Sequence, residues 1–174
     1  VFLARAIGIE AVSIIAREKY EFLKKNFSEN SLLKMMDLIN NPGINVLKEA
    51  RLLWENFNIK AMHDPTEGGI SAALYEIASR CDIGITVNKK SLVFYPGLIR
   101  LAHLFRFNPY GIISSGCIVG IISSEDSAKM VKFMHKKGIK CPIIGETTDE
   151  KGVYLQDGIK KVPFPIFDRD EITN

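Results

Sequence analysis

The stretch from His63 to Gly69, with the sequence HDPTEGG, constrains the fold more than any other part of the chain. It ends a short β-like segment, Ile59 to His63, and leads into a helical pattern that runs from Pro65 to Arg80. A strand that passes directly into a helix is the repeating unit of α/β architecture. The sequence therefore predicts a sheet with packed helices, and it places HDPTEGG at the end of a strand.

The rest of the chain also alternates between strand-like and helical patterns. A continuous apolar run, Cys117 to Ile122, is typical of a strand buried on both faces. The long helical opening, residues 10–57, argues against a regular doubly wound fold. We therefore expect an α/β (α+β) domain with a mixed β-sheet and flanking helices. Further strands are expected at 1–6, 84–88, 141–144 and 152–155, the last two paired with each other, and helices at 10–27, 45–57, 96–105 and 124–137.

Composition narrows the class of protein. A chain of 174 residues with 47% apolar residues suits one domain, and its net charge of +3 comes from scattered lysine pairs rather than a basic stripe, which argues against nucleic acid. No apolar run approaches the ~18 residues that a membrane span requires. The three cysteines, Cys81, Cys117 and Cys141, lack metal or disulfide spacing, so we expect a reduced, cytoplasmic protein with no metal held by this chain. Because Val1 stands where a strand is already under way, we expect a piece of a longer protein.

HDPTEGG has the composition of a helix start. Asp64 can serve as the N-cap, Pro65 as the first helical residue, and Glu67 can complete a capping box. These roles leave Gly68 and Gly69 unexplained, because glycine in a first turn costs roughly 1 kcal/mol relative to alanine. Such a cost is tolerated where something approaches the backbone closely. Either a ligand phosphate at the helix N-terminus or another backbone segment in the core satisfies this requirement.

The neighbouring side chains refine the ligand hypothesis. Carboxylates at Asp64 and Glu67 repel a bare phosphate, so a metal–nucleotide complex fits better than a free anion. His63, at the end of the strand, is either a hydrogen-bonded structural residue or a catalytic one. A second loop, GIISSG at 111–116, leads into the buried strand and places small donors at a sheet end, where α/β proteins bind ligands. A tight turn or bulge explains this loop equally well.

Five segments together resemble the C-terminal domain of the aminoimidazole-ribonucleotide (AIR) synthase superfamily. The most specific is AMHDPTEGGISAALYEIA, at 61–78. The others follow the same order along the chain: AIGIEAVSIIARE at 6–18, NPGINVLKEARLLWE at 41–55, GIISSGCIVGII at 111–122 and CPIIGETTDEKGVYL at 141–155. The resemblance implies a PurM-type C-terminal domain, loosely ferredoxin-like, over residues 1–160, with an irregular tail at 161–174.

Members of this superfamily are ATP-dependent enzymes that activate a small substrate with a phosphoryl or nucleotidyl group. The resemblance implies that ATP, Mg²⁺ and a small-molecule substrate bind in a cleft against an N-terminal domain that is absent from this chain. It also implies a homodimer for the full-length protein and an inactive isolated domain. It suggests catalytic roles for Asp64, Glu67 and His63, and nucleotide or phosphate binding by Thr66, Gly68, Gly69, Ser114, Ser115 and Gly116.

Within the superfamily, HDPTEGG is most similar to the loop of the hydrogenase-maturation protein HypE. Two features depart from that pattern. The chain ends in DRDEITN instead of the short tail whose cysteine carries a carbamoyl group, and Ser115 stands where an acidic residue is usual. These departures leave two hypotheses: a HypE-like, ATP-dependent enzyme domain, or a non-catalytic binding or interaction module derived from the same superfamily.

Overall fold

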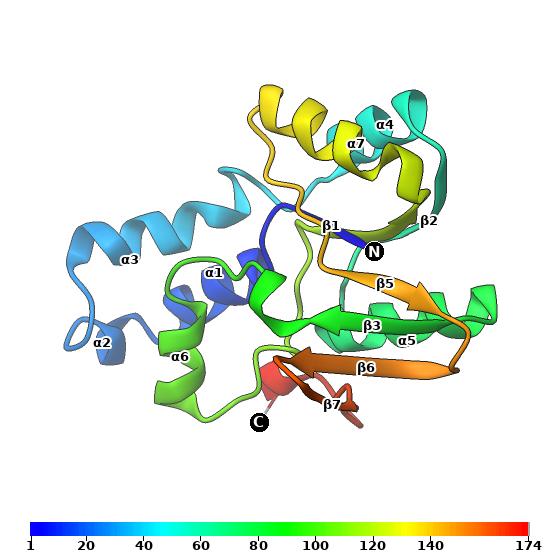
Figure 1. The fold of residues 1–174 in the computed structure, drawn as a ribbon. Helices are drawn as coiled ribbons and strands as arrows, with labels where there is room; N and C mark the ends of the chain where they lie inside the picture. Colours follow the sequence, from blue (N-terminus) through cyan, green and yellow to red (C-terminus); the bar gives the residue numbers. More distant parts are fainter. Residues whose placement is uncertain (174) are drawn as a thin grey trace.

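The computed structural model describes residues 1–173, which form an α/β domain with two sheets (Figure 1). The first sheet is antiparallel, with the strand order β1-β4-β2: β1 (Phe2–Ala4), β4 (Ile118–Ile122) and β2 (Ile59–His63). The second sheet is mixed, with the order β5-β3-β6-β7: β5 (Gly145–Thr148), β3 (Gly84–Asn88), β6 (Gly152–Asp157) and β7 (Lys160–Pro163). The predicted fold class, a mixed α/β arrangement with flanking helices, is confirmed.

Helices cover both sheets. In Figure 1, α4 and α7 lie together over the first sheet, α5 runs behind the second sheet, and the remaining helices gather at one side. The α-helices are α1 (Ile9–Glu18), α2 (Tyr20–Leu23), α3 (Glu29–Met36), α4 (Leu47–Asn56), α5 (Gly69–Cys81), α6 (Leu98–Phe105) and α7 (Ser124–Lys136), and three short 3₁₀ turns are η1 (Asp37–Ile39), η2 (Lys89–Ser91) and η3 (Glu171–Thr173). The single helix expected at 10–27 is divided at Lys19, whose backbone leaves helical geometry (φ −112°). Within residues 1–173, no helix is long and apolar enough to cross a membrane.

Strand β4 separates two apolar clusters, as its continuous apolar run predicts. Val119 and Ile121 face the larger cluster, which α5 and the second sheet share, whereas Ile118 and Ile122 face a smaller one under α4 and α7. Because successive side chains of a strand point to opposite faces, all five residues of β4 are buried. In the strand order of the first sheet β4 lies in the middle, so the loop that precedes it lies between the ends of β1 and β2.

The connection from β5 to β6 corrects the predicted strand pairing. Residues 141–144 form only an isolated bridge at Ile143, and β5 and β6 do not pair with each other but lie on either side of β3. The connection crosses the end of β3 at Gly84, where a Cβ atom would lie 1.7 Å from the carbonyl oxygen of Glu150. A glycine is therefore required at this crossing. The pattern of alternating side chains could not reveal it, because the contact is between backbone segments.

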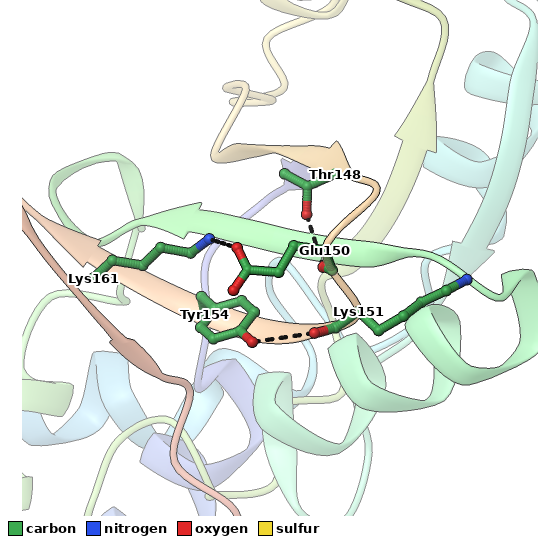
Figure 2. A network of polar contacts seen from close by, with 5 residues as sticks. All are labelled: Thr148, Glu150, Lys151, Tyr154 and Lys161. Atoms are coloured by element: carbon green, nitrogen blue, oxygen red, sulfur yellow. Dashed lines mark hydrogen bonds and ion pairs between the residues drawn. The ribbon is translucent and has the colours of Figure 1, made fainter.

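Polar contacts hold this connection in place (Figure 2). The Thr148 hydroxyl donates to the Glu150 carbonyl oxygen over 3.1 Å, and the Tyr154 hydroxyl donates to the Lys151 carbonyl oxygen over 3.1 Å. The Lys161 ammonium of β7 pairs with the Glu150 carboxylate at 2.5 Å and lies 4.3 Å from the centre of the Tyr154 ring. Lys161 belongs to β7, so the expectation of an irregular segment from residue 161 is wrong for its first three residues.

Candidate functional site

Three loops meet at one end of the first sheet. In the antiparallel register, His63 pairs with Val119 and Ala4 pairs with Ile118. The ends of β1 and β2 therefore lie beside the start of β4. This arrangement brings HDPTEGG next to the GIISSG loop, so the two segments singled out from the sequence lie side by side at this end of the sheet.

Arg5, directly after β1, ties a fourth segment to this end of the sheet. Its guanidinium donates to the carbonyl oxygens of Gly43 at 2.6 Å and Asn45 at 3.2 Å. Gly116 packs against the same segment, since a Cβ on Gly116 would lie 3.4 Å from the Gly43 oxygen. Sequence reasoning missed Arg5 and its contact with this segment, although residues 43–45 belong to NPGINVLKEARLLWE, one of the five segments that carry the family resemblance. The turn at Pro42 and Gly43 was visible, but its distance of almost 40 residues from Arg5 hid the contact.

The glycine pair does not occupy the first turn of a capped helix. Helix α5 begins at Gly69, its N-cap is Gly68, and no side chain caps it. The predicted helix start at Pro65, with Asp64 as N-cap and Glu67 completing a capping box, is therefore wrong. The physical reason is conformational: Gly68 and Gly69 both have positive φ, +74° and +59°, so the chain turns sharply there before the helix can start.

Backbone packing explains Gly69 without a ligand. A Cβ on Gly69 would lie 2.4 Å from the carbonyl oxygen of Ile112 and 2.8 Å from that of Tyr110. The Ser71 amide donates to the same Tyr110 oxygen over 3.0 Å. Of the two explanations that the sequence left open, another backbone segment accounts for this glycine. The start of α5 is joined closely to the loop that leads into the GIISSG segment.

Gly68 faces an anion, but that anion belongs to the chain itself. The Gly68 amide donates to a carboxylate oxygen of Asp170 over 2.7 Å, and the Gly69 amide donates to the Thr66 carbonyl oxygen over 3.0 Å. Both amides thus have acceptors within the domain. The sequence predicted a ligand phosphate or another backbone segment at the glycine pair, whereas the partner of the Gly68 amide is a carboxylate of the same chain, 102 residues away.

The side chains of HDPTEGG divide into exposed and engaged groups. Asp64 and Glu67 are exposed, and Thr66 is half-buried. The Nε2 atom of His63 contacts the Glu76 carboxylate on α5, and its Nδ1 atom lies 3.0 Å from the Asp64 carbonyl oxygen. The geometry of His63 thus matches the hydrogen-bonded reading, whereas Asp64, Thr66 and Glu67 remain accessible to a ligand.

The opposing loop presents less polar surface than its sequence suggests. Ser114 is fully buried and its hydroxyl donates to the Ile112 carbonyl oxygen over 2.8 Å, while Ser115 is half-buried. Gly116 has a positive φ of +101° and closes the turn into β4. Below it, burial raises the pKa of the Cys117 thiol to about 12, although Arg5 acts in the opposite direction. Cys117 is therefore a core residue and not a nucleophile at neutral pH.

A shallow groove extends from this site along the start of α4. Its lining includes the apolar side chains of Val46, Met62 and Ile118 and the polar residues Asn45 and Asp64. Within residues 1–173, no three His, Cys, Asp or Glu side chains gather in a way that would hold a metal ion. Two exposed carboxylates thus lie at this end of the sheet: Asp64, which lines the groove, and Glu67, three residues further along the chain.

The fold and site define an α/β domain whose loops gather at one end of a sheet to present an open, polar-rimmed surface. The family model "AIR synthase related protein, C-terminal domain" matches residues 9–158, and the chain belongs to this family. That result confirms the resemblance read from the five sequence segments.

The chain is similar to several proteins named for hydrogenase formation or maturation. A putative hydrogenase expression/formation protein of Methanocaldococcus jannaschii is 34% identical over 130 residues, which cover 72% of this chain and 38% of the relative. The crystal structure of Escherichia coli HypE superimposes with a TM-score of 0.77 at 19% identity, covering 98% of this chain and 50% of that one. A HypE structure in complex with ATP gives 0.69 at 13%, covering 98% and 51%. The chain therefore spans between 38% and 51% of the length of these relatives.

Proposed function

We propose that this chain forms one wall of an inter-domain site for Mg-ATP and a small substrate in a HypE-like, ATP-dependent protein. The observation that carries the proposal is the meeting of HDPTEGG with the loop before β4 at one end of the first sheet. Similarity to a HypE that was crystallised with ATP supports it. The other wall would come from an N-terminal domain outside residues 1–174, and the full-length protein would be a cytoplasmic homodimer with residues 1–160 as its C-terminal domain.

The accessible side chains suit a magnesium-bound triphosphate. Asp64 and Glu67 are exposed at the rim, and Mg²⁺ characteristically uses one or two carboxylates together with phosphate oxygens and water. Bound Mg²⁺ would neutralise negative charge of the phosphates, which the two carboxylates would otherwise repel. The Gly68 and Gly69 amides already have acceptors, so they shape the loop. We assign ligand contact to Asp64, Thr66 and Glu67, with Ser115 and Gly116 on the opposing wall.

Isothermal titration of the full-length protein with ATP, with and without Mg²⁺, tests the proposal. We expect binding that depends on Mg²⁺ and that weakens about tenfold or more in Asp64→Asn and Glu67→Gln, because a contact to a charged group contributes about 1.5–3 kcal/mol. The matched control is Asp149→Asn, which neutralises an exposed carboxylate in the β5–β6 connection. Absence of binding at millimolar Mg-ATP would refute the proposal, as would equal weakening by the control.

A non-catalytic binding or interaction module is the second candidate. It is favoured by two hydrogen bonds within the chain: the Gly68 amide and the Ser71 hydroxyl both donate to acceptors in the segment after β7. Under this candidate, the full-length protein folds normally but neither binds Mg-ATP nor turns it over. Phosphate release measured alongside the titration separates the two candidates, because turnover that is lost in Asp64→Asn but kept in Asp149→Asn supports only the enzyme.

A further inference from the structure

The segment from Phe164 to Thr173, which we call the strap, lies along α5 and reaches the start of that helix. The Tyr75 hydroxyl donates to the Phe164 carbonyl oxygen over 2.7 Å, and the Ser71 hydroxyl donates to the carbonyl oxygen of Pro165. These contacts lead one helical turn at a time toward Gly68. The strap is therefore bound along one face of α5 and does not extend freely into solvent.

Aromatic side chains of the strap also pack against the 108–116 loop. Phe164 is buried, and its ring centre lies 5.1 Å from that of Tyr110. The ring of Phe167 fills the space over Gly111, where a Cβ atom would lie only 2.5 Å from it. With Phe164 and Phe167 anchored in this way, the residues that follow have a defined position between α5 and the 108–116 loop.

Two consecutive acids of the strap each hold the backbone of a different site loop. Asp170 accepts a hydrogen bond from the Gly68 amide at 2.7 Å, and its other carboxylate oxygen accepts one from the Ile172 amide at 2.8 Å. Glu171 accepts from the Asn108 amide at 2.6 Å, and its own amide donates to the Gly111 carbonyl oxygen at 3.0 Å. One segment thus links HDPTEGG to the loop that leads into GIISSG.

We propose that Asp170 and Glu171 are positioning residues that set the spacing between these two loops, so that the strap is a working part of the site. Carboxylates suit this role because hydrogen bonds from amides to ionised acceptors are stronger and shorter than neutral ones. The link to ligand binding rests on the proposed function, whereas the link between the loops does not. The two parts can therefore be tested separately.

Hydrogen–deuterium exchange on the full-length protein, without ligand, tests the link between the loops. We expect Asp170→Ala to speed exchange in residues 63–69 and also in 108–116, while the amides of β4 keep their protection. Asp170→Asn retains an acceptor oxygen for Gly68 and should restore most of the protection. The control is Asp168→Ala, which removes an exposed carboxylate of the same strap. Changes confined to the strap, or equal changes throughout the chain, would overturn the proposal.

Titration of the same variants with Mg-ATP tests the link to the ligand. We expect Asp170→Ala and Glu171→Ala each to weaken binding about tenfold, Asp170→Asn to weaken it less, and Asp168→Ala to leave it unchanged. Tighter binding by Asp170→Ala would show that this carboxylate blocks the site, and it would overturn the positioning role. If the wild-type protein fails to bind Mg-ATP, the proposed function fails, but the exchange experiment still decides whether the strap couples the loops.

Discussion

Replacing Gly69 with alanine tests whether close backbone packing, and not a ligand, is the reason for a glycine at the start of α5. The new Cβ would lie 2.4 Å from the Ile112 carbonyl oxygen, 2.8 Å from the Tyr110 carbonyl oxygen and 2.9 Å from the Ile112 nitrogen. All three atoms belong to the backbone, so no side chain can rotate away. Either the 110–112 segment or the helix must move for the variant to fold.

The expected cost has two parts. A left-handed conformation, here φ +59°, costs a non-glycine residue roughly 1–2 kcal/mol. Forcing extra volume into packed structure adds typically about 1–3 kcal/mol. We therefore expect Gly69→Ala to lower the free energy of unfolding by roughly 2–5 kcal/mol. Gly138→Ala isolates the first part, because Gly138 also has a positive φ, +74°, but nothing lies within 4 Å of the position of its Cβ.

Urea unfolding followed by far-ultraviolet circular dichroism measures both variants. The free energy of unfolding of small proteins falls by about 1–3 kcal/mol per molar urea. The steric part of the cost should therefore lower the urea midpoint of Gly69→Ala by about 1 M more than that of Gly138→Ala. The measurement needs no nucleotide, and a ligand-based reason for the glycine predicts no such difference. Equal midpoints for the two variants would refute the packing argument and return Gly69 to the list of candidate ligand contacts.

Two further predictions concern titrating groups. The hydrogen bond from Lys161 lowers the pKa of Glu150 below its ordinary value of 4.5, so its contribution to stability is complete above about pH 4.5 and is lost as the pH falls through the lowered pKa. Glu150→Gln should therefore flatten the acid side of the pH–stability curve, and a curve parallel to the wild type would contradict this. Burial raises the pKa values of Cys117 and Cys141 to about 12, whereas Cys81 is exposed. A thiol reagent at pH 8 should label one cysteine in the native chain, and rapid native labelling of Cys81→Ser would show that a buried thiol is accessible.

Most helices and strands could be predicted from the sequence, because the spacing of apolar residues and the capping residues lie within each element. Strands β2, β3 and β4 follow from alternating or continuous apolar residues, and α7 follows from acids in its first turn and Gly138 after its end. The meeting of HDPTEGG with GIISSG could be anticipated because both segments flank strands at a sheet end. Their contacts were not predictable, since the register of β2 on β4 determines which residues lie side by side.

The errors have a common physical cause, which is that backbone packing between distant segments leaves no periodic trace. Gly84 allows the β5–β6 connection to cross β3, and nothing in the sequence around Gly84 identifies Glu150 as its neighbour. Similarly, the sequence did not reveal the partners of Asp170 and Glu171 in DRDEITN. Their partners are the backbone amides of Gly68 and Asn108. Every residue except proline has a backbone amide, so such a partner leaves no signal in the composition.

Gly68 and Gly69 were the main sign of a ligand in the sequence, because glycine is unfavourable in the first turn of a helix. The structure explains the two glycines by their positive φ, and at Gly69 also by the close approach of the 110–112 backbone, while Asp170 and the Thr66 carbonyl oxygen accept hydrogen bonds from their amides. Because the chain itself satisfies both amides, the glycines give no independent evidence for a phosphate. Recognition of an anionic ligand at this surface then depends on Asp64 and Glu67, whose charge is of the same sign. Under the proposed function we therefore expect nucleotide binding to require Mg²⁺, and binding that proved independent of Mg²⁺ would contradict this assignment of the site.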